Sequence, residues 1–235
     1  MAEQPAWSVG VASRRDTRDH NCDAARVHTG PDGVLAAAVI DGTGNSAELA
    51  TLAGVLAEVT VRIGARRGGM AALITAGDLI HDEHEAAAVV ATADEDRPVH
   101  VWWVGDCRAS WWDSGASLRA VTTDHTMGQQ LRASGGVPVD LAATHDHWLL
   151  IGLADATPST IRQVWVPDYG QDLGAGELVL LTSDGVHDAV PHDELVALIR
   201  EQRDPQDLAE VIVAAAREDD GYRDDATVIV LARRC

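Results

Sequence analysis

The 235-residue chain contains no lysine, so all 18 of its basic residues are arginines, and they are outnumbered by 37 acidic residues. The formal net charge is -19 at pH 7. Binding to the phosphates of a nucleic acid requires a basic surface, and so does electrostatic attraction to an anionic membrane. The composition therefore argues against nucleic acids and membrane surfaces as partners.

Cysteine is also scarce, with only Cys22, Cys107 and Cys235 in the chain. Three widely spaced cysteines indicate neither a disulfide framework nor a zinc site, which favours a reducing compartment. The first residues lack the basic and apolar segments of a signal peptide, and no apolar run is long enough to span a bilayer. We expect a soluble, cytoplasmic protein.

The length fits a single domain over residues 1–235 with a sizeable core. Apolar and alternating runs predict strands that occur largely in pairs. Periodicities of three and four residues predict helices in two pairs, one in the middle of the chain and one near its end. The expected strands cover 7–13, 24–28, 34–40, 99–104, 109–112, a short run to 121, 177–182 and 228–231.

The expected helices cover 46–62, 70–90, a segment from 127, 193–202 and 205–217, and residues 139–175 form the least regular part. This order differs from regular βαβ alternation. It favours an α+β fold in which antiparallel sheet packs against helices.

Several strands share an unusual ending, in which an apolar run leads directly to an aspartate. Val34–Ile40 leads to Asp41-Gly42, Leu178–Thr182 leads to Ser183-Asp184-Gly185, and Val101–Val104 leads to Gly105-Asp106. Asp224 and Asp225 precede the last strand, and Asp188 follows Asp184 by four residues. A single Asp-Gly after a strand is usually only a turn. The repetition of the pattern indicates that these carboxylates converge on one site.

Converging carboxylates would repel each other strongly unless cations compensated their charge. Hard oxygen ligands without nearby His or Cys point to Mg²⁺ or Mn²⁺ rather than zinc. Two such ions can lower the pKa of a shared water and orient a phosphoryl group. The guanidinium of Arg18 is placed in the sequence to clamp phosphate oxygens.

Other features have simpler interpretations. His81 and His84 could form a metal pair on the expected helix 70–90, but an exposed acidic helix face explains them better. The Trp pairs 102–103 and 111–112 place one ring on each face of a strand, which suits core plus surface packing rather than base stacking. A nucleophilic Cys22 or Cys107 has no partner histidine at a suitable spacing.

In their order and spacing, these residues resemble the motifs of the metal-dependent PPM (PP2C-like) Ser/Thr protein phosphatases in their compact bacterial form. The resemblance extends from Arg18 to Leu231, and six short motifs in the correct order are far more specific than any one of them. The motifs are Arg18-x-x-Asn21-x-Asp23, Ile40-Asp41-Gly42, Gly105-Asp106-Cys107-Arg108, Asp124-His125-Thr126, Ser183-Asp184-Gly185-Val186-x-Asp188 and Asp224-Asp225-x-Thr227.

The resemblance implies a four-layer α-β-β-α sandwich of two antiparallel sheets flanked by helix pairs. It implies a binuclear Mg²⁺ or Mn²⁺ centre that activates a water for direct attack on the phosphoryl group. Asp41, the Gly42 carbonyl, Asp184 and Asp224 would hold the two ions, and Arg18 would bind the substrate phosphate. Asp23 would hold metal-bound water, and Asp106 and Asp188 with Asp184 would form a third, weaker site.

Three positions depart from the family pattern. Cys22 stands where the family has an acidic residue, Thr43 stands where some members have a histidine, and Asn45 stands where a second glycine is common. These departures leave two hypotheses open. One is a phosphatase acting on phosphorylated Ser/Thr proteins, as a monomer with a cognate kinase, and the other is a pseudophosphatase that binds a phosphoprotein or kinase without turnover.

Overall fold

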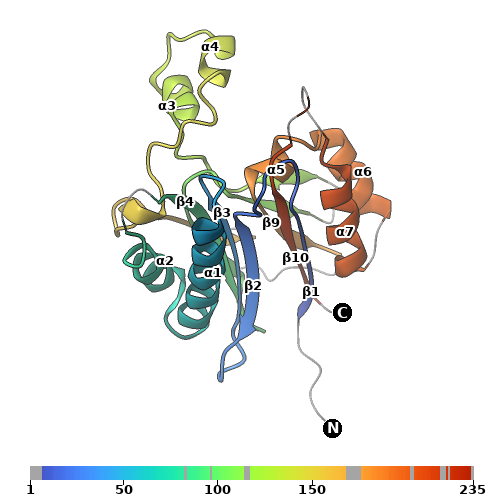
Figure 1. Ribbon diagram of the computed structural model, residues 1–235. Helices are drawn as coiled ribbons and strands as arrows, with labels where there is room; N and C mark the ends of the chain where they lie inside the picture. Colours follow the sequence, from blue (N-terminus) through green and yellow to red (C-terminus); the bar gives the residue numbers. More distant parts are fainter. Residues whose placement is uncertain are drawn as a thin grey trace.

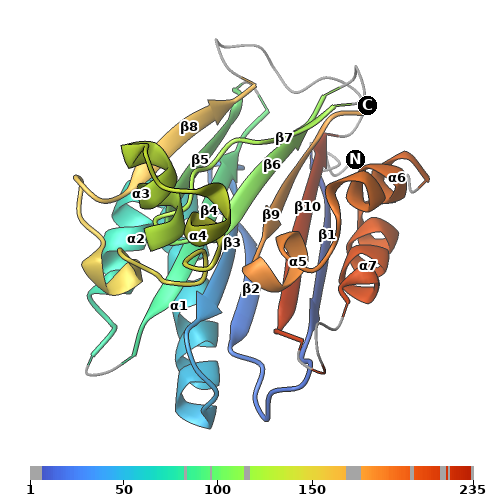
Figure 2. The same cartoon turned by 90° about the horizontal axis from the view of Figure 1, so that it is seen from above.

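The computed structural model describes residues 7–81, 84–95, 97–113, 117–167, 176–201, 204–217, 221 and 223–233. Two five-stranded antiparallel sheets face each other, and helices cover the outer face of each sheet (Figure 1). Figure 2 shows the four layers from above, with α1 and α2 beside one sheet and α6 and α7 beside the other. The predicted α-β-β-α sandwich is therefore confirmed. Cys235 lies outside the described residues.

The first sheet joins the two ends of the chain, because the first strand pairs with the last along its whole length. All pairings in this sheet are antiparallel. Its strands, in spatial order, are β1 (Trp7–Arg14), β10 (Ala226–Arg233), β9 (Leu178–Thr182), β6 (Arg108–Trp112) and β7 (Leu118–Ala120).

The second sheet is built from the first half of the chain together with one later edge strand. Its strands, in spatial order, are β2 (Asp23–Thr29), β3 (Leu35–Gly42), β4 (Ala86–Ala93), β5 (Val99–Val104) and β8 (Arg162–Val166). β5 and β6 are consecutive in the chain but belong to opposite sheets. The turn between them contains Gly105, whose φ of 93° favours glycine.

Two long helices pack on the second sheet and two on the first. The side chain of Ser46 caps the N-terminus of the first helix by accepting a hydrogen bond from Leu49 N at 3.1 Å. The helices are α1 (Ala47–Arg67), α2 (Gly69–Gly77), α3 (Met127–Ser134), α4 (Val139–Ala143), α5 (Asp184–His187), α6 (His192–Glu201) and α7 (Pro205–Ala215), with a 3₁₀ turn at Leu153–Asp155.

Successive side chains of a strand point to opposite faces of its sheet, and this produces three separate apolar layers. In β3, Ala37 and Val39 pack between the two sheets, whereas Ala38 and Ile40 pack against α1 and α2. The same parity holds in β2, β4 and β5, whose odd-numbered residues face the space between the sheets, whereas the edge strand β8 contributes its even-numbered Val164 and Val166. The rings of each Trp pair lie on opposite faces of their strand, as predicted: Trp103 and Trp111 pack between the sheets, and Trp102 and Trp112 pack on the helix sides. The expected surface position is wrong, because Trp102 and Trp112 are buried beneath the helices.

The predicted helix over 70–90 is wrong. α2 ends at Gly77, and Ala86–Ala93 forms β4 in the middle of the second sheet. Both faces of β4 are covered by apolar layers, so its alanine-rich sequence shows no alternation and looks like a helix. His81 and His84 lie in the connection between α2 and β4 and not on a helix.

Smaller differences concern the ends of helices. α1 continues to Arg67 instead of stopping at Arg62, because nothing interrupts it before Gly68, whose φ is 80°. The four-residue helix α5, directly after β9, was not predicted from the sequence. The irregular stretch 139–175 contains α4, the 3₁₀ turn and β8 within its described part, and residues 168–175 lie outside the described ranges.

α3 and α4 form a small excursion that rises above the sandwich (Figure 1). Thr126 caps α3 by accepting a hydrogen bond from Gln129 N at 3.3 Å. Arg132 of α3 pairs with Asp146 through Nη1 and Nη2 of its guanidinium. In the described ranges, every helix is too short or too polar for a bilayer span.

Candidate metal centre

A cavity of about 570 Å³ lies at the end of the sandwich where β3 ends and β4 begins. Carboxylates from separate segments line it, together with one arginine and part of the loop that follows α4. The lining residues are Arg18, Asp41, Gly42, Thr43, Glu85, Ala87, Asp106, His147, Leu149, Asp184 and Asp224.

The alternation of β3 explains why Asp41 faces this cavity. It continues the odd-numbered face formed by Ala37 and Val39, so its carboxylate points between the sheets where their apolar core ends. Asp23 is its direct partner across the β2–β3 pair and shares that face. Gly42 follows with little free space, because a Cβ there would lie 2.9 Å from the Cys22 carbonyl oxygen.

The carboxylates lie close enough to repel one another. Burial raises the pKa of Asp41 well above its ordinary value, and the negative charges of Asp184 and Asp23 raise it further. Burial and the charge of Asp184 raise the pKa of Asp106 to about 7. Burial and the charge of Asp224 also raise the pKa of Asp184. A cation placed among these groups would relieve both the desolvation and the repulsion.

Asp23 lies behind the cavity rather than on its wall. Only 8 % of the residue is exposed, and its carboxylate accepts a hydrogen bond of 2.7 Å from Ser183 Oγ. Ser183 Oγ in turn accepts a hydrogen bond from Thr227 N at 3.0 Å. This chain of contacts ties the end of β2 to the ends of β9 and β10, so the two sheets are connected beneath Asp41.

Arg18 enters the cavity from the loop between β1 and β2. Its Nη2 donates to Asp224 Oδ2 at 2.5 Å, and its Nη1 donates to the Gly44 carbonyl oxygen at 3.0 Å. Asp225, next to Asp224, fixes the same loop by accepting hydrogen bonds from Cys22 N at 2.9 Å and from Asp16 N at 3.2 Å. The guanidinium is therefore held at the mouth of the carboxylate cluster.

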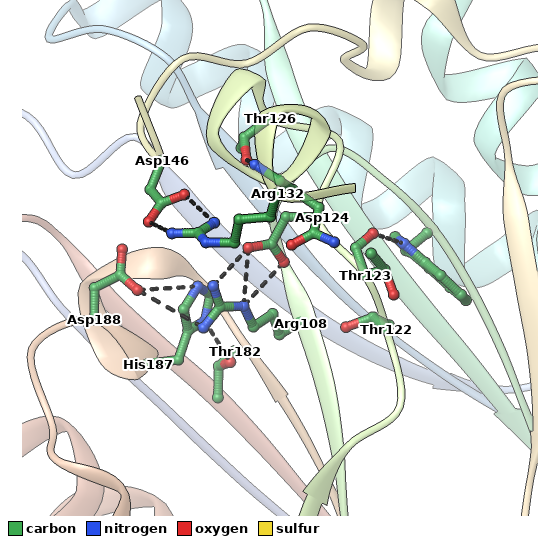
Figure 3. Close-up of polar contacts among 12 residues, drawn as sticks. Arg108, Thr122, Thr123, Asp124, Thr126, Arg132, Asp146, Thr182, His187 and Asp188 are labelled. Atoms are coloured by element: carbon green, nitrogen blue, oxygen red, sulfur yellow. Dashed lines mark hydrogen bonds and ion pairs between the residues drawn. The ribbon is translucent and has the colours of Figure 1, made fainter. Parts of the chain in front are cut away.

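Asp106 lines the cavity, whereas Asp188 stands outside its lining with 63 % of its side chain exposed. Figure 3 shows Arg108 between Asp188 and Asp124. Arg108 forms a two-pronged pair with Asp124 at 2.9 and 2.5 Å and lies 3.7 Å from Asp188. This arginine links the start of β6 to the segment that leads into α3.

The donor set fits a hard divalent cation. Carboxylate oxygens predominate on the cavity wall, and burial and mutual repulsion raise the pKa values of Asp41 and Asp106, an effect that a bound cation would oppose. Within the described ranges, no three or more His, Cys, Asp or Glu side chains form a ready-made ligand cage. This arrangement suits Mg²⁺ or Mn²⁺, which bind through a few carboxylates and keep several waters.

Four residues at or beside the site have roles that the sequence reasoning did not assign. Ser183 and Asp225 stand directly beside the predicted ligands Asp184 and Asp224, and this adjacency in the sequence could have indicated that they belong to the site. Glu85 precedes β4, where its Oε1 accepts hydrogen bonds from Ala86 N at 2.8 Å and Ala154 N at 3.1 Å. His147 comes from the irregular stretch and has no sequence signal.

The cysteine at position 22 is turned away from the cavity. Its side chain is fully buried, and its Sγ lies 3.8 Å from the Ser46 carbonyl oxygen. Burial raises the pKa of the Cys22 thiol and, more strongly, that of Cys107. Both thiols are therefore kept in the protonated, poorly nucleophilic form, which argues against thiolate catalysis.

Comparison with solved structures gives the same architecture repeatedly. A serine/threonine phosphatase from S. agalactiae superposes with a TM-score of 0.82 at 15% identity, covering 97% of this chain and 100% of that one. The PPM Ser-Thr phosphatase MsPP from Mycobacterium smegmatis, solved with cacodylate, gives 0.77 at 22% identity, covering 97% and 98%. The catalytic domain of PstP, solved with 2 manganese ions, gives 0.70 at 20% identity, covering 96% and 97%.

The chain has the PPM phosphatase fold. Among curated proteins, human protein phosphatase 1F is 29% identical over 150 residues. That match covers 58% of this chain and 33% of the human protein, so the aligned part spans about a third of the relative's length. No protein-family model matches the chain. The resemblance read from six short motifs is thus confirmed by structures that have the PPM fold.

Proposed function

We propose that this protein is a metal-dependent phosphatase acting on phosphoserine and phosphothreonine in proteins. The observation that carries the proposal is the convergence of Asp41, Asp106, Asp184 and Asp224 on one cavity together with Arg18. The PPM fold supports it, since the named neighbours with this fold are serine/threonine phosphatases.

Asp41, Asp184, Asp224 and the Gly42 carbonyl would hold two ions, and Asp106 with Asp188 would serve a third, weaker site. When bound, Mn²⁺ or Mg²⁺ supplies charge neutralisation for the phosphoryl group and a water of lowered pKa. The chain's own contribution is positional. Arg18 would leave Asp224 to bind phosphate oxygens in a two-pronged contact. Asp23, held by Ser183, would orient water at the base of the site.

The proposal is tested by hydrolysis of p-nitrophenyl phosphate and a phosphothreonine peptide as the Mn²⁺ and Mg²⁺ concentrations are varied. We expect metal-dependent turnover that falls at least about 100-fold in Asp184→Asn, because changing even the partners of a metal ligand commonly costs about 10–100-fold. Asp193→Asn, on the surface of α6, is the matched control and should retain full activity. Absence of turnover with every peptide and metal would overturn the proposal.

A second function, phosphoprotein binding without turnover, is favoured by two observations at the same site. Arg18 is engaged by Asp224, and position 22 offers a buried thiol where the PPM pattern has a carboxylate. Cys22→Glu distinguishes the two functions. Tight phosphopeptide binding by the unmodified protein without turnover, together with activity gained in Cys22→Glu, would identify a pseudophosphatase.

The wider setting follows from the same reasoning. A phosphoprotein substrate implies a Ser/Thr kinase that supplies it, and we propose that the protein acts in the cytoplasm as a monomer with one domain over residues 1–235. The net charge of -19 favours substrates whose docking surface is basic around the phosphorylated residue.

A further inference from the structure

A second cavity, of about 290 Å³, lies at the opposite end of the second sheet. It is bounded by Val34 just before β3, by the end of β4 and by the last turn of α1. Val34 and Asp41 are separated by seven residues of strand, which is about 23 Å at the usual rise of about 3.3 Å per residue. A ligand in this second cavity would therefore not touch the carboxylate cluster.

One wall of the cavity is a stack of three rings. His100 lies between Trp165 and Trp102, with ring centroids 3.7 and 3.6 Å apart. The stack follows from the sheet register, because His100 and Trp165 are direct cross-strand partners and Trp102 is two residues further along β5. Trp102 is 6 % exposed and belongs to the core, whereas Trp165 is 42 % exposed on the edge strand β8.

The backbone facing this wall is adapted to it. A Cβ at Gly69 would lie 2.3 Å from Cε3 of Trp102, so the start of α2 can approach the ring only because residue 69 is glycine. Trp102 is further fixed by a 2.8 Å hydrogen bond from its Nε1 to Gln163 Oε1. The inner part of the wall is therefore rigid, and the exposed ring of Trp165 is an available flat surface.

The polar groups of the wall and rim favour an anion over a cation. Burial lowers the pKa of His100 to about 4, so the central ring is neutral at neutral pH, and its Nε2 has no hydrogen-bond partner within the described part of the chain. Arg66, in the last turn of α1, forms no ion pair with any residue in the described ranges. Arg97 pairs with Asp94 at 3.5 Å, which leaves the charge of Arg66 uncompensated at the rim.

We propose that this cavity binds a planar aromatic anion, that is, a ring system of about mononucleotide size carrying a phosphate or carboxylate group. The ring would stack on Trp165, and the anionic group would contact the guanidinium of Arg66. Aromatic walls with a few convergent polar groups are typical of small-molecule sites, and a cavity of about 290 Å³ suits a small ligand of this kind. A cationic ring would be repelled by the guanidinium of Arg66.

The experiment is isothermal titration calorimetry on the full chain, without divalent metal so that no hydrolysis occurs. The probes are adenosine 5′-monophosphate, guanosine 5′-monophosphate and indole-3-acetate, compared with adenosine, which lacks the anion, and inorganic phosphate, which lacks the ring. We expect at least one aromatic anion to bind with a dissociation constant on the order of 10⁻⁵ to 10⁻³ M. Adenosine and phosphate should each bind at least about tenfold more weakly.

Variants locate the site. Trp165→Ala and Arg66→Ala should each weaken binding about tenfold or more. Arg62→Ala, one turn earlier on α1 and paired with Glu58, is the matched control and should bind normally. Arg18→Ala should also bind normally, which separates this cavity from the carboxylate cluster. Absence of binding by all three aromatic anions, or binding unaffected by Trp165→Ala and Arg66→Ala, would overturn the proposal.

Discussion

At the scale of single residues, the main cost in this fold is the electrostatic repulsion among carboxylates at the end of β3. Asp106 illustrates it, because burial and the charge of Asp184 raise its pKa to about 7 in the folded protein. A raised carboxyl pKa means that the group favours folding at low pH and opposes it once it ionises. The metal-free protein should therefore lose stability as the pH rises from about 4 through 7.

We predict that Asp106→Asn stabilises the metal-free protein, and that the gain grows with pH. The amide cannot ionise, so it avoids a penalty that grows as the pH rises from about 4 to about 7 and stays constant above pH 7. Urea unfolding should show a gain on the order of 1–3 kcal/mol at pH 8 and a clearly smaller gain at pH 5. Asp140→Asn, at an exposed position of α4, should change stability by less than about 0.5 kcal/mol at either pH. An equal gain in stability at both pH values would contradict a raised pKa of Asp106 as the cause.

Ser183 is a second residue on which the site depends. Its buried hydroxyl donates to Asp23 and accepts from Thr227 N, so Ser183→Ala removes one hydrogen bond from each of two buried polar groups. We expect a loss of about 1–3 kcal/mol in the free energy of unfolding, measured by urea denaturation. Ser13→Ala removes a hydroxyl that is only partly buried and bonds Thr227 Oγ1 at 2.7 Å. If Ser13→Ala lowered the free energy of unfolding as much as Ser183→Ala, burial of the Ser183 hydroxyl would not explain the destabilisation.

At the scale of elements, α7 protects the free edge of β1. Gln206 accepts a hydrogen bond from Val11 N and donates one to the Val11 carbonyl oxygen, both at 3.0 Å. Among the described residues, β1 is an edge strand that pairs with β10, so these backbone groups would otherwise be available to another chain. The side chain of Gln206 therefore takes the place of an adjacent strand.

We predict that Gln206→Ala costs about 1 kcal/mol and speeds hydrogen exchange at the Val11 amide, since the edge loses its partner. Amide exchange measured by NMR provides the test. Glu210→Ala, one turn later on the same helix, removes only the contact between Glu210 and the Gln206 amide and should leave Val11 protected. Equal protection of Val11 in both variants would contradict this role.

The strands that were clearest in the sequence were those with a distinctive pattern at one end. β3, β9 and β10 each have an apolar run next to an acidic turn, and the structure places strands there. β4 could not be read, because a central strand buried on both faces has no alternation and its alanines favour a helix. The partition of β5 and β6 between two sheets is also absent from the sequence, since it depends on a turn at Gly105 that resembles a hairpin.

The candidate site was readable for a similar reason. Each of the four cavity aspartates stands beside an apolar run, so the sequence alone shows both the residue type and its place at a strand end. They are Asp41, Asp106, Asp184 and Asp224. Glu85 and His147 also line the cavity but come from a connection and from the irregular stretch. Their approach to the site depends on tertiary packing, which leaves no local pattern.

At the scale of the whole molecule, the carboxylate cluster links metal binding to folding. The unfolded chain cannot hold Asp41, Asp184 and Asp224 together, so an ion that binds the folded state stabilises it by mass action. At a free Mn²⁺ concentration of 100 times the dissociation constant, the stabilisation is about 2.7 kcal/mol. For a domain of this length, that corresponds to a rise in Tm of roughly 5–10 °C.

We therefore predict that the Tm of the protein rises by roughly 5–10 °C on addition of Mn²⁺ and falls back when EDTA removes it, as followed by scanning calorimetry. Asp41→Asn should behave in the opposite way: its metal-free Tm should exceed that of the unmodified protein, because one repelling charge is gone, and Mn²⁺ should raise it little. Asp193→Asn should keep the full Mn²⁺ response. The contradicting result would be a Tm of the unmodified protein that does not change with Mn²⁺, although Asp41→Asn still raises the metal-free Tm. The carboxylates would then repel one another without binding metal, and the proposed hydrolysis would lose its physical basis.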